Sequence, residues 1–112
     1  MRLSRMYLVA LACLALALAP AVAGRTEGHP GRVAVSIENY AFQPDPITVV
    51  VGATVVWTNR DEVNHTVVSN DKLFSSPELE ANRTFEFTFK KAGTFPYFCS
   101  LHPEMKGKVI VK

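Results

Sequence analysis

Three side chains that can bind a soft metal ion follow one another closely near the end of the chain. Cys99, His102 and Met105 are spaced as C-x2-H-x2-M and offer a thiolate, an imidazole and a thioether. Pro103 restricts the backbone beside the histidine, and Gly107 permits a sharp entry into the segment that follows. A loop this short can direct all three side chains to one point, so the pattern predicts a metal-binding loop.

A second imidazole, His65, lies far upstream at the start of another segment that we expect to be a strand. Two histidines and one cysteine with a weak axial methionine describe a blue-copper electron-transfer site. Such a set suits both Cu(I) and Cu(II) when a stiff β scaffold holds it, whereas structural zinc sites use cysteine and histidine without methionine. We therefore predict a single type 1 copper ion with four ligands: His65, Cys99, His102 and Met105.

The beginning of the chain has the order of a secretory signal peptide. Arg2 and Arg5 precede an apolar run over residues 6–19, and Ala21-Val22-Ala23 follows. The run is shorter than the roughly 20 apolar residues that a membrane helix needs. We expect export to the periplasm or beyond, with no stable membrane insertion after cleavage. The predicted organisation is a cleaved signal peptide over 1–23, a flexible leader over 24–31 and a copper-binding domain over 32–112.

The cysteine content supports a ligand role for Cys99. The chain has two cysteines, and Cys13 falls in the predicted signal peptide. Lipidation of Cys13 and an uncleaved membrane anchor are the alternatives to cleavage. Without Cys13, Cys99 is the only thiol of the mature chain, so it has no internal disulfide partner. An unpaired cysteine in an exported protein pairs between molecules, acts as a nucleophile or binds a metal.

The charge balance argues against a nucleic-acid partner. The whole chain has 12 basic and 10 acidic residues, and the predicted signal peptide removes two basic residues and no acidic ones. The mature domain is then neutral, because 10 basic residues balance 10 acidic ones. Nucleic-acid-binding domains present a net basic surface, which this domain lacks.

The rest of the mature chain has the pattern of short strands. Val33, Val35 and Ile37 alternate with small or polar residues, which is the period of a strand with one buried face. Seven or eight such strands predict an all-β Greek-key β-sandwich, with Trp57 and the phenylalanines in its core. Residues 71–81 are irregular, with room for one helical turn. We expect strands over 33–37, 47–51, 54–58, 65–69, 84–90, 94–99 and 108–112, where 47–51 and 54–58 are two strands or one bent strand.

From about Val33 to Lys112 the chain resembles the cupredoxins, the family of plastocyanin, pseudoazurin and amicyanin. Four segments carry the resemblance: VVVGATVVWTN at 49–59, NHTV at 64–67, AGTFPYFC at 92–99 and LHPEMKG at 101–107. The two residues between His102 and Met105 make the loop most similar to that of amicyanin. Phe98 stands where many amicyanin-like sequences carry histidine, so the resemblance does not extend to amicyanin's dehydrogenase partner.

The resemblance implies a monomeric one-electron carrier that is not an enzyme and that serves redox partner proteins whose identity the sequence does not give. It also implies that His102 reaches the surface among apolar neighbours such as Leu101 and Pro103, and that electrons pass through this imidazole. Ser100 is a candidate donor to the cysteine sulfur, and Asn64 is a candidate brace for the His65 loop. Two other functions stay open: a copper-buffering or delivery module with the same ligands, and a cysteine hydrolase with a Cys99–histidine dyad.

Overall fold

The computed structural model describes residues 31–112, which form strands and no helix. The predicted signal peptide and all but the last residue of the predicted leader lie outside the described residues. Within residues 31–112 there is accordingly no helix that could cross a membrane. Eight strands confirm the predicted all-β class: β1 (Arg32–Glu38), β2 (Ala41–Gln43), β3 (Ile47–Val49), β4 (Thr54–Asn59), β5 (Val68–Ser69), β6 (Thr84–Thr88), β7 (Gly93–Phe98) and β8 (Lys106–Val111).

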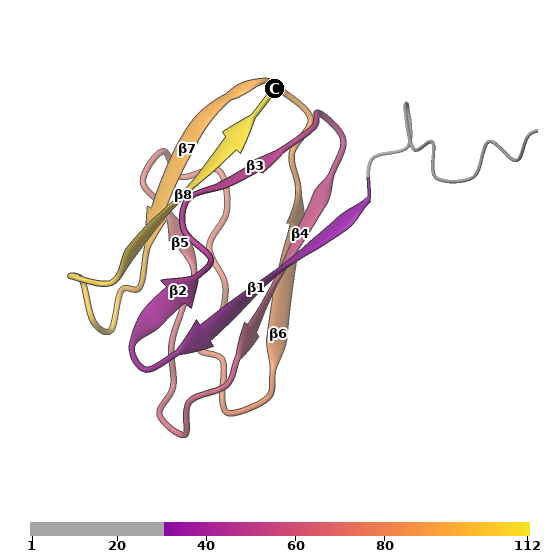
Figure 1. Cartoon of the computed structure of the whole chain (residues 1–112). Coiled ribbons are helices and arrows are strands. Elements are labelled where there is room, and N and C mark those ends of the chain that lie inside the picture. The colour runs from indigo at the N-terminus through magenta and orange to yellow at the C-terminus, as the bar shows by residue number, and fades with distance from the viewer. Residues whose placement is uncertain (1–30) are drawn as a thin grey trace, which may run out of the picture.

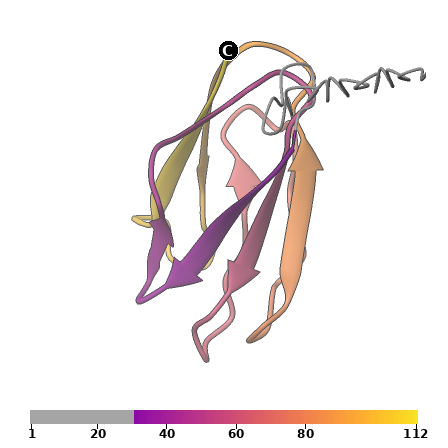
Figure 2. The same cartoon turned by 45° about the vertical axis from the view of Figure 1, so that its right-hand side comes forward.

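The strands form two sheets of four, which pack face to face as a sandwich (Figures 1 and 2). One sheet has the order β2-β1-β4-β6 and the other the order β3-β8-β7-β5. Strands β1 and β4 pair in parallel, as do β3 and β8, while the remaining neighbours are antiparallel. The strands that precede the predicted ligands, β4 and β7, therefore belong to opposite sheets.

Trp57 on β4 joins the two sheets through the core. Its side chain is fully buried, and its ring lies 5.4 Å from Tyr97 of β7 and 5.9 Å from Phe85 of β6, measured between ring centroids. Every second residue of β4 is buried, as the alternating sequence predicts. Aromatic rings bury large apolar areas and pack in few orientations, so this cluster fixes how β4 and β7 lie relative to each other.

The first half of the domain confirms one of the two arrangements expected for residues 47–58 and adds one strand that was not expected. Residues 47–58 form two strands in different sheets, β3 and β4, with the chain turning at Gly52, where φ is 95°. Strand β2 was not expected, because three residues are too few to show an alternating pattern. It forms because its backbone pairs with β1 and Phe42 enters the core.

The middle of the chain contains less strand than predicted. Only β5 forms within the expected strand over 65–69, and His65 instead makes an isolated bridge with Leu79. The segment over 71–81 is irregular, as expected, and no helical turn forms in it. His65 is thus positioned by a bridge to an irregular segment rather than by a sheet.

Three connections meet at the end of the sandwich opposite the C-terminus (Figure 1). They are the β1–β2 turn, the segment that follows β4 and the loop between β7 and β8. Their ring contacts bring Tyr40, His65 and His102 within 5.3 Å of one another, measured between centroids. The fold therefore gathers the predicted site from connections that are far apart in the sequence.

Candidate metal centre

The ligand loop, residues 99–105, is closed by its own backbone. The Cys99 amide donates to the Met105 carbonyl at 3.0 Å, the Met105 amide to the His102 carbonyl at 2.8 Å, and the His102 amide to the Cys99 carbonyl at 3.2 Å. Gly107 pairs directly with Tyr97 across the β7–β8 ladder, and a Cβ at this position would overlap the Tyr97 ring. The glycine therefore lets β8 begin close against β7, as the sequence predicted for this turn.

The segment that carries His65, residues 60–67, is held against residues 76–79. His65 and Leu79 exchange two backbone hydrogen bonds, of 3.2 and 2.8 Å, and the His65 side chain is fully buried. Asn64 donates to Glu78 at 3.1 Å, so the bracing role expected of this asparagine is directed at the neighbouring segment. The position of His65 is thus set by its backbone hydrogen bonds to Leu79.

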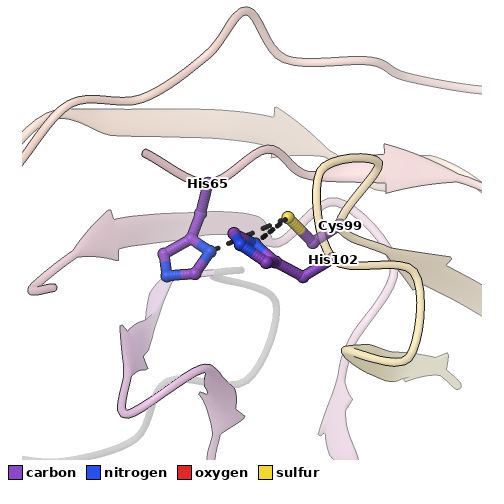
Figure 3. Close-up of side chains that lie close together, drawn as sticks. All are labelled: His65, Cys99 and His102. Carbon is purple, nitrogen blue, oxygen red and sulfur yellow. Dashed lines mark hydrogen bonds between the residues drawn. The ribbon is translucent and has the colours of Figure 1, made fainter. Parts of the chain in front are cut away.

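The structure brings three of the four predicted ligands together (Figure 3). The Cys99 Sγ atom lies 3.7 Å from His65 Nδ1 and 3.7 Å from His102 Nδ1. One donor atom from each residue lies within 4.8 Å of the other two. His65 and Cys99 are buried and His102 is half-buried. The two imidazoles therefore turn the same ring nitrogen toward one sulfur.

These distances fit a single ion shared by the three donors. With the bond lengths of zinc sites, about 2.3 Å to a thiolate and about 2.0–2.1 Å to an imidazole, sulfur and nitrogen lie about 3.7–3.8 Å apart when they meet at ~120° on one ion. The observed separation of 3.7 Å agrees with this trigonal arrangement for both histidines. Thiolate, two imidazoles and a nearby thioether are the donors that copper takes in electron-transfer sites.

Met105 is placed at the closing end of the ligand loop. It is 5% exposed, and its backbone bonds to Cys99 and His102 hold it next to the cluster. Its role as the fourth ligand stays a prediction. At the surface, Leu101 is 41% exposed beside the half-buried His102, and Pro103 is exposed as well. An edge of the second imidazole therefore lies near solvent among apolar neighbours.

Asp61 orients His65 and was missed by the sequence analysis. Its Oδ2 atom lies 2.8 Å from His65 Nε2, and its carboxylate accepts the amides of Asn39 at 2.7 Å and Tyr40 at 3.0 Å. Burial by itself would raise the pKa of Asp61, but the hydrogen bonds from Tyr40, Asn39 and His65 together lower it. An ionised carboxylate at Nε2 favours the tautomer with the proton there, which leaves Nδ1 free to bind a metal.

The cysteine sulfur accepts hydrogen bonds from Thr66 rather than from Ser100, so the expected role of Ser100 is wrong. The Thr66 amide lies 3.3 Å from Cys99 Sγ, and the Thr66 hydroxyl lies 3.7 Å from it. The Ser100 amide donates to the Thr66 hydroxyl at 2.7 Å, so Ser100 affects the sulfur only through Thr66. Thr66 follows His65 directly in the sequence. This adjacency could have identified Thr66, because the segment that carries the His65 ligand also lies beside the Cys99 ligand.

Comparisons with known proteins agree with this geometry. A family model described as a cupredoxin-like domain matches residues 6–111. Amicyanin-alpha of Methylorubrum extorquens is 33% identical over 110 residues, which cover 94% of this chain and 92% of the relative. A solved purple cupredoxin of Nitrosopumilus maritimus has a TM-score of 0.68 and 33% identity, covering 71% of this chain and 99% of that one. A solved Cu(I) form of a mutant amicyanin has a TM-score of 0.65 and 31% identity, covering 72% and 82%.

Proposed function

We propose that this chain, which belongs to the cupredoxin-like domain family, binds one type 1 copper ion and carries single electrons between redox partners. The ligands would be His65 Nδ1, Cys99 Sγ, His102 Nδ1 and the Met105 thioether. The observation that carries the proposal is the position of the cysteine sulfur, 3.7 Å from the Nδ1 atoms of both histidines. Copper bound there supplies one-electron chemistry by alternating between its +1 and +2 states.

The chain's own residues would keep the ligand set unchanged during electron transfer. The backbone bridge to Leu79 and the Asp61 carboxylate fix His65, and Thr66 donates to the Cys99 sulfur. Because these partners do not depend on a metal, the donors stand ready in one arrangement. A site whose ligands move little between the two oxidation states has a low reorganisation energy for electron transfer. The half-buried edge of His102 beside Leu101 is the route by which electrons would enter and leave.

The burial of Cys99 weighs against the alternative of a cysteine hydrolase. A nucleophilic thiolate must reach the substrate carbon, but the Cys99 side chain is fully buried and its sulfur lies against Thr66, His65 and His102. We propose accordingly that the protein is a carrier and converts no substrate. Its partners would be redox proteins that dock at the exposed His102 end, and it would work as a monomer.

Export to the periplasm is part of the proposal and depends on residues 1–23. If the full chain is produced in a bacterial host and recovered from the periplasm, cleavage after Ala23 should leave Gly24 as the first residue. N-terminal sequencing and intact mass measure this directly. A cytoplasmic product that retains Met1 would contradict the export proposal and leave the copper site unaffected.

The copper proposal is tested by the visible spectrum of the protein recovered after export. Addition of one equivalent of Cu(II) should produce the intense band of a copper–thiolate bond, and cyclic voltammetry should show one reversible electron per protein. Glu104→Gln is a suitable control, because it changes an exposed carboxylate on the same loop. That variant should keep the band. A colourless Cu(II) complex would overturn the proposal, and a coloured protein that passes copper to acceptor proteins but exchanges electrons slowly would favour copper delivery.

A further inference from the structure

Tyr40 lies in an unusual position between the ligand pair and solvent. Its side chain is 51% exposed, yet its ring centroid is 5.3 Å from that of His65 and 5.0 Å from that of His102. Both contacts have interplanar angles of 90°, which is the edge-to-face geometry that aromatic pairs prefer. One ring therefore contacts both imidazoles on one side and faces water on the other.

The backbone holds Tyr40 in this position against its conformational preference. Tyr40 has φ of 59° and Asn39 has φ of 56°, and a bulky residue seldom adopts this left-handed conformation. The Asp61 carboxylate accepts both amides of this turn, at 2.7 and 3.0 Å, and the same carboxylate holds His65. Strained residues that the surroundings hold in place are typical of functional sites. Asp61 thus holds the β1–β2 turn beside His65, and the Tyr40 side chain of this turn covers the site.

The two histidines depend on Tyr40 to different degrees. His65 is fixed at Nε2 by Asp61 and along its backbone by Leu79. None of residues 31–112 forms a hydrogen bond with His102 Nε2, and the ring instead lies against Tyr40, His65 and the Cys99 sulfur. Rotation of the His102 ring is therefore restrained mainly by packing. Removal of the Tyr40 ring would take away one of the contacts that restrain the His102 ring.

We propose that Tyr40 is a positioning residue for the metal centre. Its ring holds the His102 imidazole with Nδ1 toward Cys99 before any ion binds, and it keeps water from the imidazole pair afterwards. The first part of this inference concerns the metal-free protein and stands without the proposed function. The second part rests on the proposed function, because it requires copper at the cluster.

The decisive variant is Tyr40→Gly, with Tyr40→Phe as the conservative replacement. Glycine removes the ring and also relieves the strain of positive φ, so the thermal midpoint of the metal-free variant should be unchanged or higher. A residue with a merely structural role would lower it. Asn39→Gly is the control for the backbone of the turn, because it also places glycine at a positive φ and leaves the Tyr40 ring in place.

The measurements are the ring-proton chemical shifts of His65 and His102 in the metal-free protein, and the dissociation constant and visible spectrum of the copper form. In Tyr40→Gly both histidines should lose the ring-current shift, His102 should show faster ring motion, and copper should bind about tenfold more weakly, as for other residues that support ligands. Tyr40→Phe and Asn39→Gly should match the wild type within about twofold.

Unchanged histidine shifts in Tyr40→Gly would overturn the proposal, as would copper binding and band positions equal to those of the wild type. A loss of copper affinity in Asn39→Gly equal to that in Tyr40→Gly would also overturn it, because the backbone of the turn would then be responsible. If no variant, including the wild type, develops the copper–thiolate band, the proposed function fails. The shifts of the metal-free protein would still decide whether Tyr40 positions His102.

Discussion

The two segments that supply the donors are built in opposite ways. The His65 segment, residues 60–67, is fixed by outside partners: Leu79 holds its backbone and Asp61 holds its buried imidazole. The ligand loop, residues 99–105, is closed by its own backbone hydrogen bonds and reaches the surface between its two buried ends, where Leu101 is 41% exposed. The His65 segment is thus held rigidly by its neighbours. The ligand loop is compact, carries the remaining donors and brings the site to the surface.

This difference divides the properties of the site between the two segments. The loop carries the thiolate, so the identity of the metal and its colour should depend on it. The His65 segment carries the bracing, so the strength of binding should depend on its partners. Variants in each segment can therefore be ordered by the size and the kind of effect they should have.

The largest effect should come from Cys99→Ser in the ligand loop. A serine hydroxyl cannot replace the thiolate that gives type 1 copper its colour and its soft character. We expect complete loss of the visible band after Cu(II) addition, measured on folded protein. A variant that lacks the His65 imidazole should bind copper more weakly but keep a visible copper–thiolate band. Retained blue colour in Cys99→Ser would refute the ligand assignment.

The next effect should come from Gly107→Ala at the exit of the ligand loop. The added Cβ would collide with the Tyr97 ring, which is buried in the core and 1% exposed. Overpacking of this kind costs about 1–3 kcal/mol, and urea unfolding of the metal-free protein measures it. Gly31→Ala is the matched control, because nothing lies within 4 Å of a Cβ there, and it should change the free energy of unfolding by less than ~0.5 kcal/mol. Equal effects of the two variants would show that the close β7–β8 contact is unimportant.

A smaller effect is expected from Asp61→Asn beside the His65 segment. Asparagine keeps the size of the side chain but lacks the charge that favours the proton on His65 Nε2. Changes in residues that hold a ligand histidine typically weaken metal binding about 10–100-fold, and we expect the lower end of this range because the Leu79 bridge remains. Competition with a chelator measures the dissociation constant. Glu62→Gln, an exposed neighbour, should leave it unchanged; a similar loss in both variants would indicate a general charge effect.

The contrast between the two segments also explains what the sequence could predict. The ligand loop was visible because Cys99, His102 and Met105 are close in the chain and their types restrict the chemistry. The alternation in β4 likewise predicted the buried Trp57. The partners of the His65 segment were not visible, because Tyr40 reaches Asp61 and His65 only after the β1–β2 turn folds against the segment that follows β4. Ser100 was assigned the role of Thr66 for the same reason: the sequence shows neighbours along the chain and not those across the sandwich.

Met105→Leu should have a modest effect on binding and a clear one on the reduction potential. A weak axial thioether contributes little to affinity, but it stabilises Cu(II) more than a hydrocarbon can. We therefore expect copper and the visible band to be retained and the potential to rise, as measured by voltammetry. A marked loss of copper would indicate that Met105 is a strong ligand, and an unchanged potential would exclude it as a ligand.

The smallest effect at neutral pH should come from Tyr97→Phe, in the strand that leads to the ligand loop. The Tyr97 hydroxyl is buried, and it has no hydrogen-bond partner within residues 31–112. Its removal should change the free energy of unfolding at pH 7 by no more than about 1 kcal/mol, because no bond is lost. Burial raises the pKa of the folded Tyr97 well above its ordinary value of 10.0.

Alkaline pH should separate Tyr97→Phe from the wild type. A phenol whose pKa is raised in the folded state contributes stability that is fully present below the unfolded pKa and is lost as the pH rises above it. Wild-type stability should therefore fall relative to Tyr97→Phe above about pH 10, as measured by urea midpoints at pH 7, 9 and 11. Parallel curves for the two proteins would mean that the phenol reaches water in the folded state. Water would then reach the Tyr97 phenol despite its close packing on Gly107. The core beneath the ligand loop would therefore be less well packed than the buried Tyr97 ring indicates.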